Sequence, residues 1–330
     1  MSSSTTKKQK TPAIKPRRTI QIGEYTGAVR CVVHLPGRLG RRIITCSDSL
    51  RLWNLDSGAQ IGDNWQDRGD EEQVYTIALS PNGKTIAAGS ADGVVRLWDI
   101  ETGKVLVKLT GHDLIVWSVC WSTDGEHVVS GSADGTVSVW HAESHKTVLG
   151  PIKTGHEFVY AVVNSPDRTK IATGGANENG IKIWDSKTGE LLTTIEHKDS
   201  VFSLAWTSDQ KKLISGSGDG SIRIFNTKWQ EIAILEGHQT VVYAISLFHN
   251  DRLVASASWD RTARLWNLDT NLQVGPPLQH EEGVNGAAIS ADGRLLVTGC
   301  EDESAQVWGI HTILRDAGLE DLLSIPNVRH

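Results

Sequence analysis

The sequence predicts an all-β fold, a seven-bladed β-propeller, and three observations support it. Seven short apolar segments end in an aromatic residue at intervals of 41 to 45 residues: Trp53, Trp98, Trp140, Trp184, Phe225, Trp266 and Trp308. A repeat of this length is typical of four-stranded propeller blades. Asn, Asp and Gly recur between the apolar segments, where tight hairpins need a left-handed backbone. The repeat fills nearly all of the 330 residues, which predicts one closed domain.

Residues 1–17 differ in composition from the rest and are expected to form a disordered basic leader. Residues 1–18 contain six Lys and Arg residues and no acid, and the whole chain has a net charge of −6. Residues 19–330 therefore carry −12, that is −6 minus the +6 of residues 1–18. Phosphate binding needs clustered cations, so the net negative charge of residues 19–330 argues against a groove that binds nucleic acid. The leader itself could be a solvated segment, a nuclear import signal or a tether to an anionic surface.

One repeat unit shows the expected strands in order. Apolar or alternating segments bounded by turn residues read as strands, and in this unit they are residues 115–121, 127–130, 136–140 and 146–149. Tight turns at Ser122-Thr-Asp-Gly125 and Ser132-Ala-Asp-Gly135 separate the first three. A single blade has too little buried face to be stable alone, so stacking in a ring supplies the shared core and removes long free edges.

These units resemble the WD-repeat (WD40) family over residues 18–308. The unit at 111 opens with Gly111-His112, and literal Trp-Asp occurs at Trp98-Asp99 and Trp184-Asp185. The remaining units depart from it, as in Trp53-Asn54, Trp140-His141, Phe225-Asn226, Trp266-Asn267 and Trp308-Gly309. The linkers at residues 149–152 and 274–278 are similar to those of fungal members.

The pattern at the two ends of the repeat array predicts how the ring closes. Residues 18–22 look like an outer strand without a blade of their own, and the last unit ends at Trp308 without such a strand. In family members of this kind an N-terminal strand completes the last blade, and we expect the same here. The propeller would then span residues 18–308, followed by a C-terminal tail over residues 309–330 with a short helix in its apolar pattern.

Repeated His, Ser or Thr, Asp and Trp residues could suggest a nucleophilic triad. They recur at equivalent places in several blades, whereas an active site is a single asymmetric constellation. The resemblance implies instead a buried hydrogen-bond network in each blade, and the residues assigned to it are His112, Asp134, Trp140, His238, Asp260, Trp266, His280, Asp302 and Trp308. We therefore predict no catalytic residue and no cofactor. No metal site is predicted, because His and Asp of one unit lie about 22 residues apart.

Several blades depart from this set and are expected to open locally first. The first has Tyr25 where His is expected, the second has Asp70, the fourth has Glu178 in its turn, and the fifth has Phe225 in place of Trp.

One position is unusually aromatic. The residue after the Val that begins each inner strand is Arg30, Tyr75, Trp117, Tyr160, Phe202, Tyr243 or Asn285. In similar WD-repeat proteins the equivalent residue faces the rim of the central channel, as does the residue before the turn Asp, which here includes Trp259 and Glu301. The alternative interpretation is that these aromatic side chains pack between neighbouring blades and never reach solvent.

These observations predict a non-catalytic scaffold that binds a peptide or partner protein at the top face of the propeller. The predicted partner-binding residues are Arg30, Tyr75, Trp117, Tyr160, Phe202, Tyr243, Trp259 and Glu301. The alternative function is a nuclear or chromatin reader of modified histone tails through an aromatic cage. The chain has no run of 18 apolar residues, and Cys31, Cys46, Cys120 and Cys300 form no C-x-x-C pair. We therefore expect an intracellular protein, cytoplasmic or nuclear, with reduced, buried thiols and no membrane span.

Overall fold

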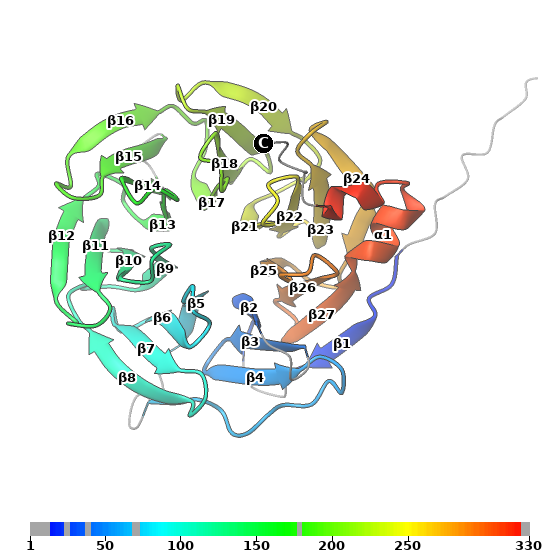
Figure 1. Cartoon of the computed structure of the whole chain (residues 1–330), viewed down its shortest axis with the longest axis horizontal. Helices are drawn as coiled ribbons and strands as arrows, with labels where there is room; N and C mark the ends of the chain where they lie inside the picture. The colour runs from blue at the N-terminus through cyan, green and yellow to red at the C-terminus, as the bar shows by residue number, and fades with distance from the viewer. Residues whose placement is uncertain (1–13, 23–26, 37–40, 68–72, 177–179, 325–330) are drawn as a thin grey trace, which may run out of the picture.

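The computed structural model describes residues 14–22, 27–36, 41–67, 73–176 and 180–324. These residues form seven small antiparallel sheets arranged around a central axis, as the view down that axis shows (Figure 1). The predicted seven-bladed propeller is therefore confirmed. Within the described part of the chain, no helix combines the length and the apolar character needed to cross a bilayer.

Each blade runs from an inner strand at the channel to an outer strand at the wall. The inner strands are β2 (Cys31–Leu35), β5 (Val74–Leu79), β9 (Val116–Trp121), β13 (Val159–Asn164), β17 (Val201–Trp206), β21 (Val242–Leu247) and β25 (Val284–Ile289). The second strands are β3 (Arg42–Cys46), β6 (Thr85–Ser90), β10 (His127–Ser132), β14 (Lys170–Gly175), β18 (Lys212–Ser217), β22 (Leu253–Ser258) and β26 (Leu295–Cys300). The third strands are β4 (Leu50–Asn54), β7 (Val95–Asp99), β11 (Thr136–His141), β15 (Ile181–Asp185), β19 (Ile222–Asn226), β23 (Thr262–Asn267) and β27 (Ser304–Gly309). The outer strands are β8 (Lys104–Leu109), β12 (Thr147–Lys153), β16 (Leu191–Ile195), β20 (Glu231–Leu235), β24 (Leu272–Gln279) and β1 (Arg18–Gln21).

The N-terminal strand closes the ring, as predicted. β1 pairs antiparallel with β27, with Arg18 opposite Val307 and Gln21 opposite Ser304, so the last blade has the order β1-β27-β26-β25. Ile20 and Ile22 from this segment are buried in a cluster that also contains Val29 of the first blade. The two ends of the repeat array are thereby joined through both backbone pairing and apolar contact.

The first blade departs from the four-stranded plan. Its sheet contains β2, β3 and β4, and two isolated bridges, Leu50 with Trp65 and Trp53 with Gln60, occupy the outer position among the described residues. Gly62 has a φ of 71°, which interrupts an extended strand between the two bridges. The segment therefore crosses the outer edge of the blade without forming a regular ladder.

The hydrophobic core lies between successive blades. One cluster joins Leu97 and Leu109 of the second blade to Val116, Val128 and Trp140 of the third. The second strand of most blades has a glycine at the point of closest approach: a Cβ built on Gly131 would lie 2.6 Å from a methyl carbon of Val159 in the next blade. Each blade is thus held by its neighbours, as expected for a closed repeat array.

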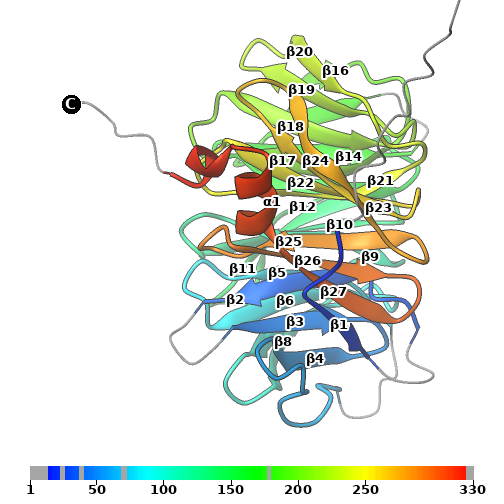
Figure 2. The same ribbon diagram turned by 90° about the vertical axis from the view of Figure 1, so that its right-hand side faces the viewer.

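The described part of the tail packs against the last two blades. Helix α1 (Ile310–Asp316) and the short 3₁₀ helix η1 (Glu320–Leu323) lie beside each other on one side of the ring (Figure 2). Their side chains contribute to a buried cluster that includes Phe248 of the sixth blade. α1 begins where β27 ends, whereas the predicted docking residues lie at the end of the blades where the inner strands begin. Because β25 and β27 run in the same direction, the helix and these residues lie on opposite faces of the ring. Residues 1–13 and 325–330 lie outside the described residues.

Candidate functional site

The third blade contains the predicted hydrogen-bond network in full. His112 Nε2 lies 2.8 Å from Ser130 Oγ, and the Trp140 indole N–H donates to the same hydroxyl at 2.8 Å. His112 Nδ1 lies 3.1 Å from Asp134 Oδ2. Ser130 is fully buried, so its hydroxyl is engaged by structural partners and cannot meet a substrate. The network satisfies buried polar groups, which would otherwise cost stability.

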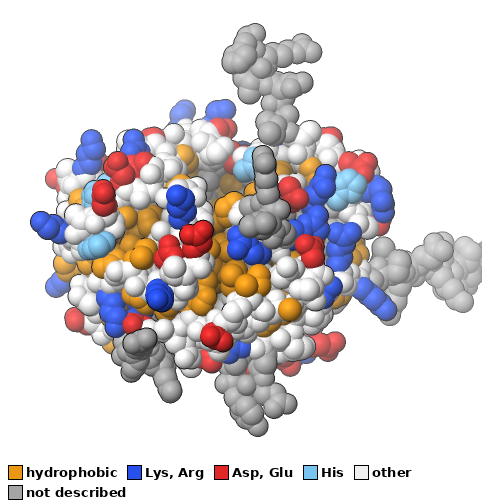
Figure 3. Space-filling model, turned by 60° about the horizontal axis from the view of Figure 1, so that its bottom comes forward, with side chains coloured by type: hydrophobic (Ala, Val, Ile, Leu, Met, Phe, Trp, Pro, Cys, Tyr) orange, Lys and Arg blue, Asp and Glu red, His pale blue; other side chains and the backbone are white. Residues whose placement is uncertain are grey.

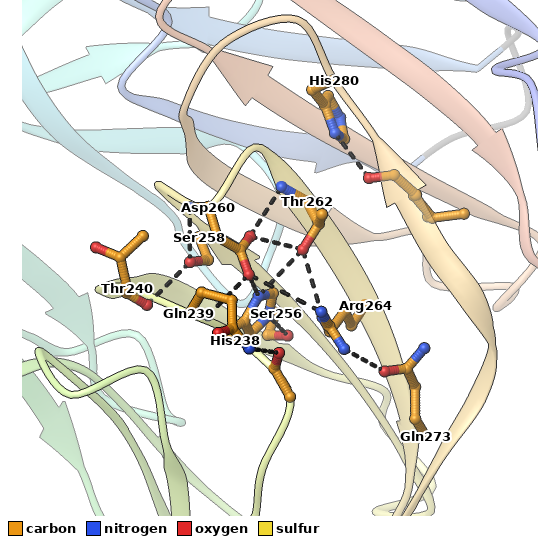
Figure 4. Close-up of polar contacts among 12 residues, drawn as sticks. His238, Gln239, Thr240, Ser256, Ser258, Asp260, Thr262, Arg264, Gln273 and His280 are labelled. Carbon is orange, nitrogen blue, oxygen red and sulfur yellow. Dashed lines mark hydrogen bonds and ion pairs between the residues drawn. The ribbon is translucent and has the colours of Figure 1, made fainter. Parts of the chain in front are cut away.

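The sixth blade repeats this arrangement (Figure 4). His238 contacts Asp260 at 2.8 Å and Ser256 at 2.7 Å. The Trp266 indole N–H donates to Ser256 at 2.8 Å. Burial alone would raise the pKa of Asp260, but hydrogen bonds from His238 and Thr262 outweigh it and lower that pKa to about 2. Burial lowers the pKa of His238, against the opposing effect of Asp260. Asp260 is therefore ionised at neutral pH, and its hydrogen bonds hold the carboxylate in the turn.

The seventh blade corrects one predicted contact. His280 Nε2 lies 2.8 Å from Thr298, which also accepts the Trp308 N–H at 3.1 Å. However, His280 Nδ1 contacts the Leu278 carbonyl at 3.0 Å, and Asp302 accepts hydrogen bonds from Ser304 instead. The prediction that Asp302 completes the network through His280 was wrong. The backbone carbonyl takes the place that a carboxylate fills in the third and sixth blades.

Two further histidines with this role were missed in the sequence. His156 contacts Thr173, which accepts the Trp184 N–H at 3.0 Å, and His197 contacts Ser215 at 3.1 Å. A His followed 17 or 18 residues later by Ser or Thr was the available signal. The expected substitutes Tyr25, Asp70 and Glu178 lie outside the described residues.

The second blade lacks the shared hydroxyl. Ala88 occupies the position of Ser130, and the buried Trp98 Nε1 has no hydrogen-bond partner among the described residues. We expect Ala88→Ser to raise the free energy of unfolding by about 1 kcal/mol, because it supplies an acceptor for that N–H. The measurement is the midpoint of urea unfolding. Ala87→Ser is the matched control: Ala87 is equally buried in an apolar cluster, so this change should be neutral or destabilising. A lower midpoint for Ala88→Ser than for Ala87→Ser would contradict the prediction.

The predicted docking residues occupy β-bulges at the starts of the inner strands. In the second blade the register passes from the Val74–Ser90 pair to the Thr76–Gly89 pair, which leaves Tyr75 without a partner opposite. The same shift leaves Trp117, Tyr160, Phe202, Tyr243 and Asn285 unpaired. A bulge re-aims the extra side chain relative to the pleat. This local geometry turns one side chain from each of these six blades toward the channel.

These side chains form a continuous arc of aromatic contacts. Successive ring centroids lie between 4.6 and 5.9 Å apart, within the usual range for aromatic pairs, in the order Tyr75, Trp117, Tyr160, Phe202, Tyr243, Trp259. The side chains do contact those of neighbouring blades, as the alternative interpretation held, but they also reach solvent, which that interpretation excluded. They pack on one another around the channel, and each is half-buried except Trp259, which is 46% exposed.

Polar residues extend the arc at both of its ends. The Trp259 N–H donates to Asn285 Oδ1 at 2.8 Å, and the Asn285 amide donates to Glu301 at 2.7 Å. At the other end, the Arg30 guanidinium carbon lies 4.2 Å from the centre of the Tyr75 ring, a cation–π contact. Gln73, which sequence reasoning missed, accepts hydrogen bonds from both Arg30 and Tyr75. We call the aromatic arc together with these polar side chains the ring.

This ring surrounds a cavity of about 490 Å³. Every residue predicted to bind a partner lines it, namely Arg30, Tyr75, Trp117, Tyr160, Phe202, Tyr243, Trp259 and Glu301. Burial raises the pKa of Tyr160 and Tyr243, so both phenols stay neutral at physiological pH. Arg30 and Glu301 supply the charged groups of the lining. The cavity can receive an apolar or cationic side chain and can orient it with two opposite charges.

Other surfaces offer less defined chemistry. The outer strands carry exposed apolar side chains, and Figure 3 shows hydrophobic side chains on one side of the molecule among scattered charges of both signs. Asp124, Glu126 and His127 lie close enough to share an ion. Asp124 already forms an ion pair with Arg168 and accepts hydrogen bonds from the Ser122 hydroxyl and the Glu126 backbone N–H. Its carboxylate oxygens are therefore already engaged by protein groups.

Comparisons with known proteins agree with the fold. A family model described as WD40, "WD domain, G-beta repeat", matches residues 66–99, 103–141, 149–185, 189–226, 229–267 and 275–309. The chain is 26% identical over 202 residues to the small ribosomal subunit protein RACK1y of Oryza sativa subsp. japonica; the match covers 58% of this chain and 46% of that relative. The structure is similar to a chain in the crystal structure of the mitotic checkpoint complex, with a TM-score of 0.78, 20% identity and coverage of 94% and 96% of the two chains.

Proposed function

The chain belongs to the WD40 repeat family, and we propose that it is a non-catalytic interaction scaffold that binds a peptide or partner protein at the aromatic cavity of its top face. The observation that carries the proposal is the set of ring side chains that line one cavity. Its relative RACK1y is named as a protein of the small ribosomal subunit, a large assembly, which favours a role in holding other proteins.

The chemistry of the ring suits a protein anchor. Tyr and Trp bring large contact areas with few rotatable bonds, so little conformational entropy is lost when a partner binds. A few such residues in a desolvated pocket commonly provide most of the binding energy of an interface. The conspicuous His, Ser and Asp groups of the blades are buried and bonded to one another. That engagement supports a scaffold over an enzyme.

We expect the double substitution Trp117→Ala and Tyr243→Ala to abolish partner binding. Both rings touch two neighbours in the arc, so their loss opens the cavity wall on two sides. Hot-spot aromatic residues cost about 2 kcal/mol or more each when truncated, which corresponds to roughly 1,000-fold weaker binding for the pair if the two losses add. The measurement is affinity purification with mass spectrometry on the wild type and the variant.

A matched control truncates exposed side chains away from the cavity. Leu106→Ala with Leu272→Ala removes apolar surface from the outer strands and should leave the top-face partners bound. Melting temperatures of all variants separate loss of binding from loss of folding, and Trp259→Ala provides a milder change at the exposed end of the arc. Identical partner lists for the wild type and the Trp117, Tyr243 variant would contradict the proposal.

A reader of methylated lysine is the second candidate, and the arc of six aromatic rings favours it. Each ring that faces a quaternary ammonium contributes roughly 0.5 to 2 kcal/mol of cation–π attraction. The same purification distinguishes the two candidates. Histones among the partners lost in the double variant would support the reader, whereas exclusion of a tagged chain from the nucleus would rule it out.

A further inference from the structure

Two cysteines face each other in the first blade. Cys31 on β2 pairs directly with Cys46 on β3. At the same register the other blades pair two small residues, as in Thr76 with Gly89 and Ser118 with Gly131. The second-strand member is glycine in five blades and Ala257 in the sixth. The first blade alone has a thiol on each strand.

The glycines at this register have a steric reason, which makes the departure informative. A Cβ built on Gly89 would lie 2.6 Å from Val116 of the next blade, and one built on Gly216 would lie 2.8 Å from Val242. The first blade accommodates a full Cys46 side chain at this crowded point, where it is completely buried. Packing alone does not require sulfur here, because the other blades have glycine or, in the sixth, alanine at this position.

The environment of the pair distinguishes its two sulfur atoms. Cys31 is half-buried and lines the aromatic cavity directly after Arg30, so it can meet a small molecule that enters there. A hydrogen bond from the Cys46 thiol lowers the pKa of Cys31 below its usual value. Burial, followed by the contact with Cys31, raises the pKa of Cys46. Cys31 is therefore the nucleophilic partner and Cys46 the protonated one.

The two remaining cysteines provide internal comparisons. Burial raises the pKa of both Cys120 and Cys300 to about 12, so they are protonated at neutral pH. All four cysteines lie in the described part of the chain, and no other pair of them shares a cross-strand register. Cys120 also lines the cavity but has no thiol opposite it. It therefore serves as a control for a cysteine that the cavity exposes and that cannot form a disulfide with a strand partner.

We propose that Cys31 and Cys46 form a redox-active dithiol that a hydroperoxide entering the cavity oxidises to a disulfide. The Cys31 thiolate attacks the terminal peroxide oxygen, the O–O bond breaks, and the alkoxide or hydroxide leaves with a proton from solvent. This step yields a sulfenic acid on Cys31. Cys46 sulfur then attacks the Cys31 sulfur, the S–O bond breaks, and the hydroxyl leaves as water with the Cys46 proton. Two thiols have lost two electrons to the peroxide. Residues directly opposite each other in an antiparallel pair, as Cys31 and Cys46 are, have Cα atoms about 4.5 to 5.5 Å apart, a spacing that a disulfide can span.

The test counts free thiols in the folded wild-type protein after treatment with hydrogen peroxide. Excess peroxide is removed, the protein is unfolded, and its thiols are alkylated and analysed by mass spectrometry. We expect the number of alkylated cysteines to fall from four to two. The lost pair should appear as one crosslinked species that joins the peptides of Cys31 and Cys46, lighter than their reduced sum by two hydrogen atoms. Dithiothreitol should restore all four thiols.

Variants assign the roles. Cys46→Ala mimics Ala257 of the sixth blade and should stop oxidation of Cys31 at the sulfenic acid, which dimedone traps, whereas Cys120→Ala should still lose two thiols. Four free thiols after treatment of the wild type, or oxidation of Cys31 to sulfinic acid without a crosslink, would overturn the proposal. The wild-type result alone decides it if a variant fails to fold. Because this readout needs no partner, it stands or fails independently of the proposed docking function.

Discussion

Replacement of Ile20 by Asp in β1 is expected to lower the free energy of unfolding by about 3 to 5 kcal/mol. Ile20 is 3% exposed and packs in the cluster that joins the last blade to the first. The substitution removes a buried aliphatic side chain and places a carboxylate where the described surroundings are apolar. It also weakens the pairing of β1 with β27, which leaves the edge of β27 open.

The neighbouring residue provides the control. Thr19 lies on the same strand with its side chain exposed, so Thr19→Asp introduces the same charge without burying it. Urea unfolding of the two variants and the wild type measures the difference. We expect Thr19→Asp to lie within about 0.5 kcal/mol of the wild type. Equal unfolding midpoints for the two Asp variants would mean that β1 does not hold the ring closed.

The closing strand shows how far the sequence could carry the fold. The 41- to 45-residue spacing of Trp and Phe predicted the number of blades, and the unpartnered apolar pattern of residues 18–22 predicted the strand exchange. Both signals arise because each blade buries apolar residues at equivalent positions, so these residues recur at regular intervals in the sequence. The missing outer strand of the first blade had no such signal, because its isolated bridges depend on two single contacts at Trp65 and Gln60.

The sequence predicted which residues form the candidate site, but not how their side chains are arranged. Residues such as Tyr75 and Trp117 were identified because aromatic residues gathered at one point of the repeat. The bulge that aims them at the channel is a property of strand register and leaves no mark in composition. The hydrogen bonds from Trp259 to Asn285 and on to Glu301 join residues 16 to 26 positions apart. Such contacts depend on side-chain directions that only the folded blades define.

The histidine networks show the same limit at smaller scale. Spacing correctly placed His112 and His238 beside their Asp partners, but the same spacing failed for His280, which turns to the carbonyl of Leu278. The contact that Nδ1 of each histidine makes, with a carboxylate or with a backbone carbonyl, is set by the folded blade. Nothing in the repeat pattern encodes that choice.

Acidification from pH 7 to pH 4 is expected to lower the free energy of unfolding by about 2 to 3 kcal/mol for each of three histidines, roughly 6 to 9 kcal/mol together. Burial lowers the pKa of His34, His197 and His280 from 6.5 to about 4. Between these values the unfolded chain binds protons that the folded protein does not, so stability rises with pH. The contribution is complete above pH 6.5 and is lost as the pH falls toward 4.

Substitution of one histidine tests whether the buried imidazoles cause this dependence of the unfolding free energy on pH. His280→Gln keeps a polar group beside Thr298 but cannot titrate, so the loss of stability between pH 6.5 and 4 should shrink by about a third, whatever its cost at pH 7. His249→Gln replaces an exposed histidine and should leave the slope unchanged. Urea unfolding at a series of pH values measures both. Asp260, whose pKa is lowered to about 2, contributes only below this window, because a carboxylate with a depressed pKa loses its stabilisation as the pH falls from its ordinary 3.8 toward 2. A slope that is unaltered in His280→Gln would show that the buried imidazoles do not govern the response to acid.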